Sequence, residues 1–120
     1  MKQNITINQF QELVMYQRFK IVILLGIADK EYDLNGFWVD SKTVNELVIS
    51  RCTIGKMLEI IRQYHQMDIY TVNEVWCVQL MELNDCANDH SNCILEISSK
   101  ELIDVLFECV LYVIENMDAN

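Results

Sequence analysis

The last stretch of the sequence constrains the fold more than any other segment. Between residues 100 and 116 the acidic residues recur at helical spacing, and nearly every other residue from 102 to 114 is apolar. At 100° per residue these acidic side chains project within an arc of about 60°. They are Glu101, Asp104, Glu108 and Glu115. We therefore predict a long C-terminal helix over residues 100–116, capped by Ser98 or Ser99, which is either the buried centre of the domain or half of an oligomer interface.

The composition provides the core that such a helix needs. The chain has 120 residues, of which 52% are hydrophobic and 22% charged, too apolar for a disordered polyelectrolyte. A domain of this size buries roughly two-thirds of the surface that its unfolded chain exposes. There is no proline and there are only three glycines, so the boundaries of the elements must come from helix caps and polar clusters. We expect a single domain over residues 1–120.

The charge is divided unevenly along the chain. The first 66 residues contain eight basic and seven acidic residues, whereas from residue 67 onward Lys100 stands against eleven acidic residues. The net charge of −9 is therefore +1 in front and −10 behind. A field of one sign repels polyanions and attracts basic surfaces. Because the basic residues of the first half are scattered, we expect no direct binding to nucleic acid, and we expect a partner protein with a basic surface.

The first half of the sequence predicts helices. Asn8 is a candidate N-cap for a helix that begins at Gln9, and its apolar residues recur at helical spacing. Residues 28–41 indicate a loop. Ser41 offers a start for a short helix to residue 49, and Thr53 caps another, amphipathic helix. The apolar face of the first helix comprises Phe10, Leu13, Val14, Ile21, Leu24 and Leu25, and that of the last comprises Met57, Leu58, Ile61 and Tyr64.

After His65 the residue types change to those that favour strands. Residues 69–80 are rich in β-branched, aromatic and aliphatic side chains, and a second such run follows at residues 93–97. The polar segment 84–92 between them is too short for a crossover, so the two strands are expected to be antiparallel. The predicted fold is α+β, with N-terminal helices, an antiparallel β-hairpin and a long buried C-terminal helix.

The cysteines suggest free thiols and one weak metal candidate. Five cysteines are an odd number, and the sequence begins with no secretory signal pattern, so no disulfide framework is expected. Thiolates and imidazoles are preferred zinc ligands, and the candidate set is Cys77, Cys86, His90 and Cys93. Since no Cys-x-x-Cys spacing is present, the favoured interpretation is a polar loop whose cysteines pack or lie exposed. We predict no metal and no cofactor.

Catalysis and membrane insertion are both disfavoured. A cysteine nucleophile needs a nearby base, and only His65 and His90 are available. No glycine-rich phosphate loop, nucleophile elbow or histidine-pair metal helix occurs. The longest apolar run, residues 21–28, is far shorter than the roughly 20 residues of a membrane span. We expect a cytoplasmic protein that is not an enzyme.

Two groups of residues are candidates for binding a partner. Asp85 and Asp89 of the polar loop, together with the four acids of the C-terminal helix, can pair with arginines of another protein. Phe37 and Trp38 follow the turn dipeptide Asn35-Gly36 and can anchor an interface, because aromatic residues concentrate binding energy. The acids can equally form a solvated face, and the aromatic pair can cover the core.

Three segments carry short motifs. They are Thr53-Ile54-Gly55-Lys56-Met57-Leu58-Glu59-Ile60, Trp76 in a predicted strand, and Lys100-Glu101-Leu102-Ile103-Asp104-Val105-Leu106-Phe107-Glu108-Cys109-Val110. In these segments the chain resembles small uncharacterised proteins encoded by phages and prophages of Gram-positive bacteria, with Val105 and Phe107 where that group has alanine and tryptophan. The resemblance implies a protein that binds host proteins, including CRISPR nucleases and other defence enzymes. It implies no catalytic residue.

We therefore expect a small acidic, non-enzymatic protein that binds a host protein stoichiometrically and inhibits it, the target being a nucleic-acid-handling defence enzyme. Two alternatives remain open at this stage. One is a small zinc-binding module built on the Cys86, His90 and Cys93 loop. The other is a structural subunit whose apolar C-terminal helix forms a homodimer.

Overall fold

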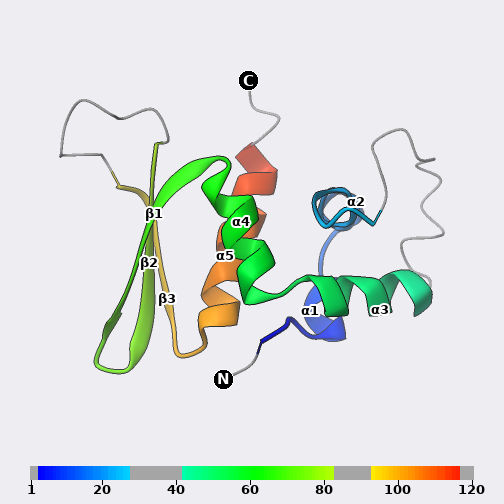
Figure 1. Cartoon of the computed structure of the whole chain (residues 1–120), viewed down its shortest axis with the longest axis horizontal. Helices are drawn as coiled ribbons and strands as arrows, with labels where there is room; N and C mark the ends of the chain where they lie inside the picture. The colour runs from blue at the N-terminus through cyan, green and yellow to red at the C-terminus, as the bar shows by residue number, and fades with distance from the viewer. Residues whose placement is uncertain (1–2, 28–41, 83–92, 117–120) are drawn as a thin grey trace.

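The computed structural model describes residues 3–27, 42–82 and 93–116. Its strands form one layer, α4 and α5 cover one face of that layer, and α1, α2 and α3 lie beyond them, away from the sheet (Figure 1). The arrangement confirms the predicted α+β class. In chain order the elements are α1 (Ile7–Gln11), α2 (Met15–Leu24), α3 (Lys42–Arg51), α4 (Ile54–Arg62), β1 (His65–Val72), β2 (Val75–Glu82), β3 (Cys93–Ser99) and α5 (Leu102–Asn116).

The C-terminal helix α5 is the centre of the domain. Nine of its 15 residues are buried, and it contacts α2, α4, β2 and β3. It begins at Leu102, two residues later than predicted, and the Ser99 hydroxyl accepts a hydrogen bond from the backbone N–H of Glu101 at 3.4 Å. Because the apolar surface of α5 is buried within one chain, a homodimer is not required to cover it.

The N-terminal segment forms two helices, where the sequence predicted one. The predicted N-cap at Asn8 was wrong: Thr6 caps α1, and its hydroxyl accepts a hydrogen bond from the N–H of Gln9. The chain then breaks between residues 12 and 14. The Arg18 guanidinium bridges the break by donating to the carbonyl of Leu13 at 3.0 Å and to that of Gln11 at 3.2 Å.

The break changes which apolar side chains are buried. Val14 was expected on the core face, but it precedes the first turn of α2 and is 63% exposed. Val22 was not among the residues expected on the core face, and it is fully buried. A helix interrupted between residues 12 and 14 loses its continuous 100° periodicity, so the part after the break presents a different set of residues to the core.

The middle of the chain folds as two helices, as predicted. Thr53 caps α4, with its hydroxyl accepting from the Lys56 N–H at 3.1 Å. The buried residues of α4 are Met57, Ile60 and Ile61. This spacing places them on one face of the helix, against α5 and β1.

Removing the cap at Thr53 tests this part of the fold. Thr53→Ala leaves the N–H of Lys56 without its side-chain acceptor, so we expect the free energy of unfolding to fall by about 1 kcal/mol. Urea unfolding followed by circular dichroism measures the change. Thr53→Ser retains a hydroxyl and is the control. Equal losses in both variants would contradict a capping role.

The sheet has three antiparallel strands in the order β1-β2-β3. The prediction of one strand over residues 69–80 was wrong, because a two-residue turn at Asn73 and Glu74 divides this run. Both residues have positive φ, 52° and 68°, as a type I′ hairpin turn requires. Glycine usually marks such turns, and its absence here hid the turn. The predicted antiparallel pairing of β2 with β3 is confirmed.

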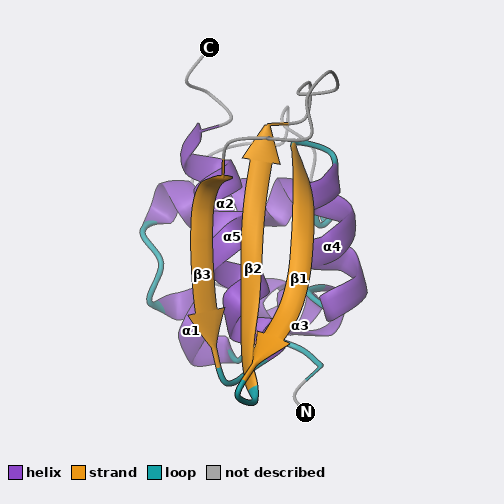
Figure 2. Ribbon diagram, turned by 90° about the vertical axis from the view of Figure 1, so that its left-hand side faces the viewer, coloured by secondary structure: helices purple, strands orange, loops and turns teal. Residues whose placement is uncertain are grey.

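One face of the sheet contributes to the core. Side chains on this face alternate along each strand and pack against the core helices. Val78 lies opposite Ile69 on β1 and Ile97 on β3, which forms an apolar row across all three strands. The other face carries no layer of helices in the part of the chain that the structure describes, and Figure 2 views the molecule from that side.

Four of the five cysteines are described, and all four are free thiols, as predicted. Cys52 and Cys109 are buried, whereas Cys93 is exposed. Among the described helices none is long and apolar enough to cross a membrane.

Candidate functional site

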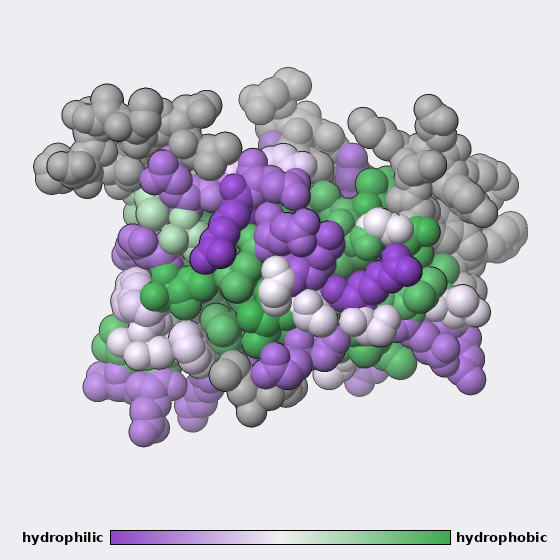
Figure 3. All heavy atoms as spheres, in the orientation of Figure 1, coloured by the Kyte–Doolittle hydropathy of each residue, from purple (hydrophilic) through white to green (hydrophobic). Residues whose placement is uncertain are grey.

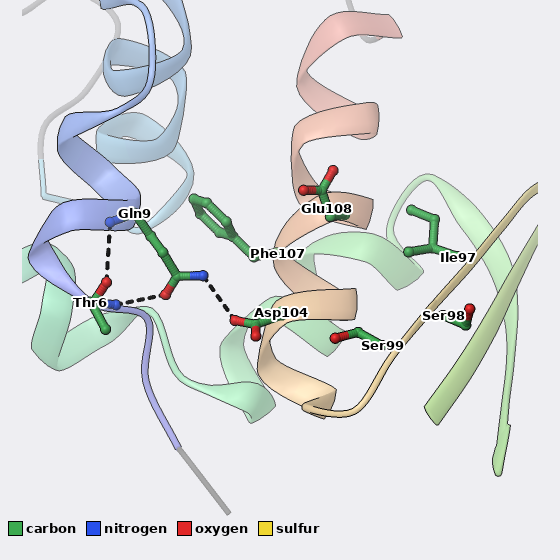
Figure 4. A pocket seen from close by; sticks show the side chains of 8 residues that line it. All are labelled: Thr6, Gln9, Ile97, Ser98, Ser99, Asp104, Phe107 and Glu108. Atoms are coloured by element: carbon green, nitrogen blue, oxygen red, sulfur yellow. Dashed lines mark hydrogen bonds between the residues drawn. The ribbon is translucent and has the colours of Figure 1, made fainter. Parts of the chain in front are cut away.

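A groove lies between α1, α5 and the end of β3. Its volume is about 610 Å³. Figure 4 shows its lining, with α1 on one side, α5 in the middle and β3 on the other side. The residues that line it are Thr6, Gln9, Ile97, Ser98, Ser99, Asp104, Phe107 and Glu108. We call it the α1–α5 groove.

The helix α5 supplies the acidic part of the groove. Asp104 and Glu108 are four residues apart, so their side chains lie one turn apart on the same face of the helix. Phe107 adds an aromatic surface beside them and is only 5% exposed. Asp104 is half-buried and Glu108 is exposed. The groove therefore presents two carboxylates over an apolar wall.

A single glutamine connects the groove to the N-terminus of α1. The Gln9 side-chain carbonyl accepts a hydrogen bond from the Thr6 N–H at 2.9 Å, which completes a capping box. The Gln9 amide nitrogen donates to Asp104 Oδ1 at 2.9 Å. Figure 4 shows both bonds. This pair of contacts holds α1 at a fixed distance from α5 and orients the Asp104 carboxylate.

Carboxylates contribute to the pKa shifts of two titratable groups, one on α5 and one on β1. Burial, followed by the Glu108 carboxylate, raises the pKa of the adjacent Cys109 thiol. Desolvation, followed by the Glu96 carboxylate, raises the pKa of Tyr70 on the uncovered face of the sheet. A guanidinium or ammonium group is the ligand that such an environment favours.

The structure separates the four predicted acids of α5. Asp104 and Glu108 lie together in the groove. Glu101 is half-buried and precedes the first turn of the helix. Glu115 lies seven residues beyond Glu108, about 10 Å along the axis, and accepts a hydrogen bond from the Gln17 side chain of α2 at 3.4 Å. The acidic arc is therefore divided, and one pair of acids belongs to a groove.

Several predicted site residues lie outside the described part of the chain. They are Phe37, Trp38, Asp85, Asp89, Cys86 and His90.

The remaining two residues of the candidate zinc set are too far apart to share an ion. Cys77 lies opposite Ser98, and Cys93 lies opposite Met81 on the same strand as Cys77. Four residues along a strand correspond to about 13 Å, whereas two sulfurs on one zinc lie within about 5 Å of each other. In the described ranges no group of three or more metal-ligating side chains is present.

Sequence reasoning predicted only Asp104 and Glu108 among the eight residues that line the groove. Thr6, Gln9 and the two serines of β3 were not predicted to join Asp104 and Glu108. One signal was available, because Thr6-x-x-Gln9 is a capping-box pattern that marks the start of a helix. The contact between Gln9 and Asp104 had no such signal, since 95 residues separate them.

Comparisons with known proteins leave the groove as the main guide to function. No protein-family model, no curated protein and no solved structure matches this chain.

Proposed function

We propose that this chain is a non-catalytic protein that binds a host protein and inhibits it, and that the α1–α5 groove receives a basic side chain of that partner. The observation that supports this most is the pair Asp104 and Glu108, which lie one turn apart in the groove. Gln9 holds the Asp104 carboxylate in place with a hydrogen bond. An arginine presents five N–H donors in a planar fork that matches carboxylate oxygens. Ser99 adds a hydroxyl oxygen on the β3 side of the groove (Figure 4).

The class of partner follows from the charge of the whole chain. The second half carries −10 of charge, and such a field accelerates association with a basic surface while repelling nucleic acids. Enzymes that handle nucleic acids hold phosphates in basic clefts. A compact acidic protein seated in such a cleft excludes the substrate. We propose a nucleic-acid-handling defence enzyme, such as a CRISPR effector, as the target.

Charge reversal in the groove tests the proposal. The double variant Asp104→Lys with Glu108→Lys places two cations where a partner cation binds, so we expect its affinity for the partner to fall at least about tenfold. The matched control is Glu46→Lys with Glu59→Lys, which changes the net charge equally at two exposed sites on α3 and α4. The wild-type chain, immobilised, captures the partner from Gram-positive host lysate, and calorimetry with the purified partner gives each affinity.

Salt and competition complete this experiment. Raising the salt from 0.1 to 0.5 M weakens the complex, because exposed ion pairs are screened. DNA or RNA bound to the partner is displaced by the wild-type chain. Equal losses of affinity in the two double variants would show that affinity depends on the net charge of the chain and not on the groove. An unchanged affinity in the groove variant would refute the assignment of the groove.

A further inference from the structure

The strand β3 is an edge of the sheet. In the order β1-β2-β3 it pairs with β2 on one side, and the described residues place no strand on its other side. Figure 2 shows β3 as the outer strand of the sheet, on the left, with β2 beside it. An edge strand presents unpaired backbone N–H and C=O groups, which an extended segment of another chain can pair with.

The register identifies the backbone groups that are available. The two-residue turn makes the Val72–Val75 pair exchange hydrogen bonds, and alternate residues of β2 then bond to β1 and to β3. The backbone N–H and C=O groups of Trp76 and Val78 are thus directed toward β3. Ser98 lies opposite Cys77, and Glu96 lies opposite Gln79; both of these β2 residues bond to β1. The backbone N–H and C=O groups of Ser98 and Glu96 are therefore directed away from β2, toward the open edge.

The α1–α5 groove lies along this edge. Ile97, Ser98 and Ser99 of β3 line it together with Asp104 and Glu108 of α5. Figure 4 shows the carboxylates of α5 between β3 and α1. A strand added to β3 would therefore lie over the groove, with one set of its side chains pointing at the carboxylates and the other set at solvent.

The spacing of the two acids suits an extended partner. Residues four apart on a helix are separated by about 6 Å along its axis. Side chains on one face of a strand are separated by about 6.8 Å. β3 and α5 contact each other and run alongside in Figure 1, so the two repeats are nearly in step. Basic residues at positions i and i+2 of an added strand reach Asp104 and Glu108 respectively.

The edge is also selective against a second copy of the chain. Glu96 sits in the middle of β3 and is exposed. If β3 paired with the β3 of another copy, the two Glu96 carboxylates would lie close together on the paired strands, where like charges are destabilising. Ile94 forms an irregularity at one end of the strand, which limits the pairing to the segment around Glu96 and Ser98. A basic strand avoids this repulsion, because opposite charges on paired strands attract each other.

We propose that an extended basic segment of the partner pairs with β3 as a fourth strand and places two alternate arginine or lysine side chains against Asp104 and Glu108. This inference rests on the proposed function and specifies how the partner is recognised. The backbone pairing provides affinity without regard to sequence, and the two carboxylates select a segment with the pattern basic-x-basic.

A synthetic peptide tests the proposal without knowledge of the partner. The probe is acetyl-Thr-Thr-Arg-Thr-Arg-Thr-Thr-amide, titrated into the full chain and followed by NMR. We expect the amides of Glu96 and Ser98 to shift, and their hydrogen exchange to slow about tenfold or more at saturation. The control acetyl-Thr-Thr-Arg-Arg-Thr-Thr-Thr-amide has the same charge but directs its arginines to opposite faces. It should bind several-fold more weakly.

Two edge variants separate backbone pairing from charge. Ser98→Pro removes an outward N–H and should weaken the probe about tenfold, whereas Thr71→Pro removes the corresponding N–H of the other edge, β1, and should change nothing. Because either proline can perturb the strand, the exchange measurement on the wild-type chain stands as the independent readout.

The possible results are distinguishable. Binding of the probe with no protection of Glu96 and Ser98 would overturn strand addition. Absence of any binding by the probe would also overturn it, even where groove charge reversal weakens the natural partner and so supports the proposed function. Protection of the same amides without the probe, rising with protein concentration, would identify a second copy as the occupant and contradict the inference.

Discussion

The Leu106→Ala substitution lowers the free energy of unfolding by about 3–4 kcal/mol. Leu106 is fully buried in α5, the helix that contacts both the sheet and α2. Truncation removes apolar contacts and leaves a cavity, and both terms destabilise the fold. For a single domain, whose total stability is about 5–15 kcal/mol, this is a large fraction. The urea midpoint should decrease correspondingly, with an unchanged slope.

The matched control for this prediction lies two residues away on the same helix. Glu108→Ala removes an exposed side chain and should change the free energy of unfolding by no more than about 0.5 kcal/mol. Both substitutions introduce alanine, so helix propensity is comparable. If Leu106→Ala cost less than about 1 kcal/mol, α5 would not be the centre of the core.

Stability should fall steeply at alkaline pH because two thiols are buried. Desolvation raises the pKa of Cys52 from 9.0 to about 12, and desolvation together with Glu108 does the same for Cys109. The unfolded thiols ionise near pH 9 while the folded ones stay protonated, so the unfolded state binds fewer protons above pH 9. The stabilisation is complete below pH 9 and is lost as the pH rises toward 12, by about 1.4 kcal/mol per pH unit for each thiol.

Variants isolate the thiols from the tyrosines and lysines that also titrate in this range. In Cys52→Ala or Cys109→Ala, the decrease in the free energy of unfolding between pH 9 and 11 should be shallower by about 1.4 kcal/mol per pH unit. Cys93 is exposed, and Cys93→Ala is the control variant that removes a thiol without removing a buried one. Urea unfolding at half-unit pH intervals measures the slopes. Identical slopes in the wild type and both buried-cysteine variants would refute this account.

Much of the fold could be predicted from local sequence patterns. The acids of α5 fall on one arc, and the rest of the helix is apolar, so its burial follows from periodicity alone. The cap at Thr53 was predicted because a hydroxyl directly precedes an amphipathic run. The failures have equally local causes. Asn73 and Glu74 form a turn without glycine, and Asn8 was taken as a cap although Thr6 has the glutamine three residues later that completes the box.

The candidate site was predictable only in part. The sequence places Asp104 and Glu108 one turn apart, which is a property of any helix, and the net charge selects a basic partner. It also placed Glu101 and Glu115 in the same surface, whereas the structure sets Glu101 ahead of the helix and pairs Glu115 with Gln17 of α2. Neighbouring elements, which a helical projection omits, divide the arc.

The sequence by itself determined the central helix, its acidic side, the α+β class and the free thiols, because each depends on the period or the kind of residues close together in the chain. Only the tertiary structure decided that these acids line a groove. That groove needs Gln9 beside Asp104, 95 positions away in the sequence. It also needs β3 to be the edge strand of the sheet, with the backbone N–H and C=O groups of Ser98 directed away from β2. Such contacts depend on how the elements pack, and no local pattern encodes the packing of elements so distant in sequence.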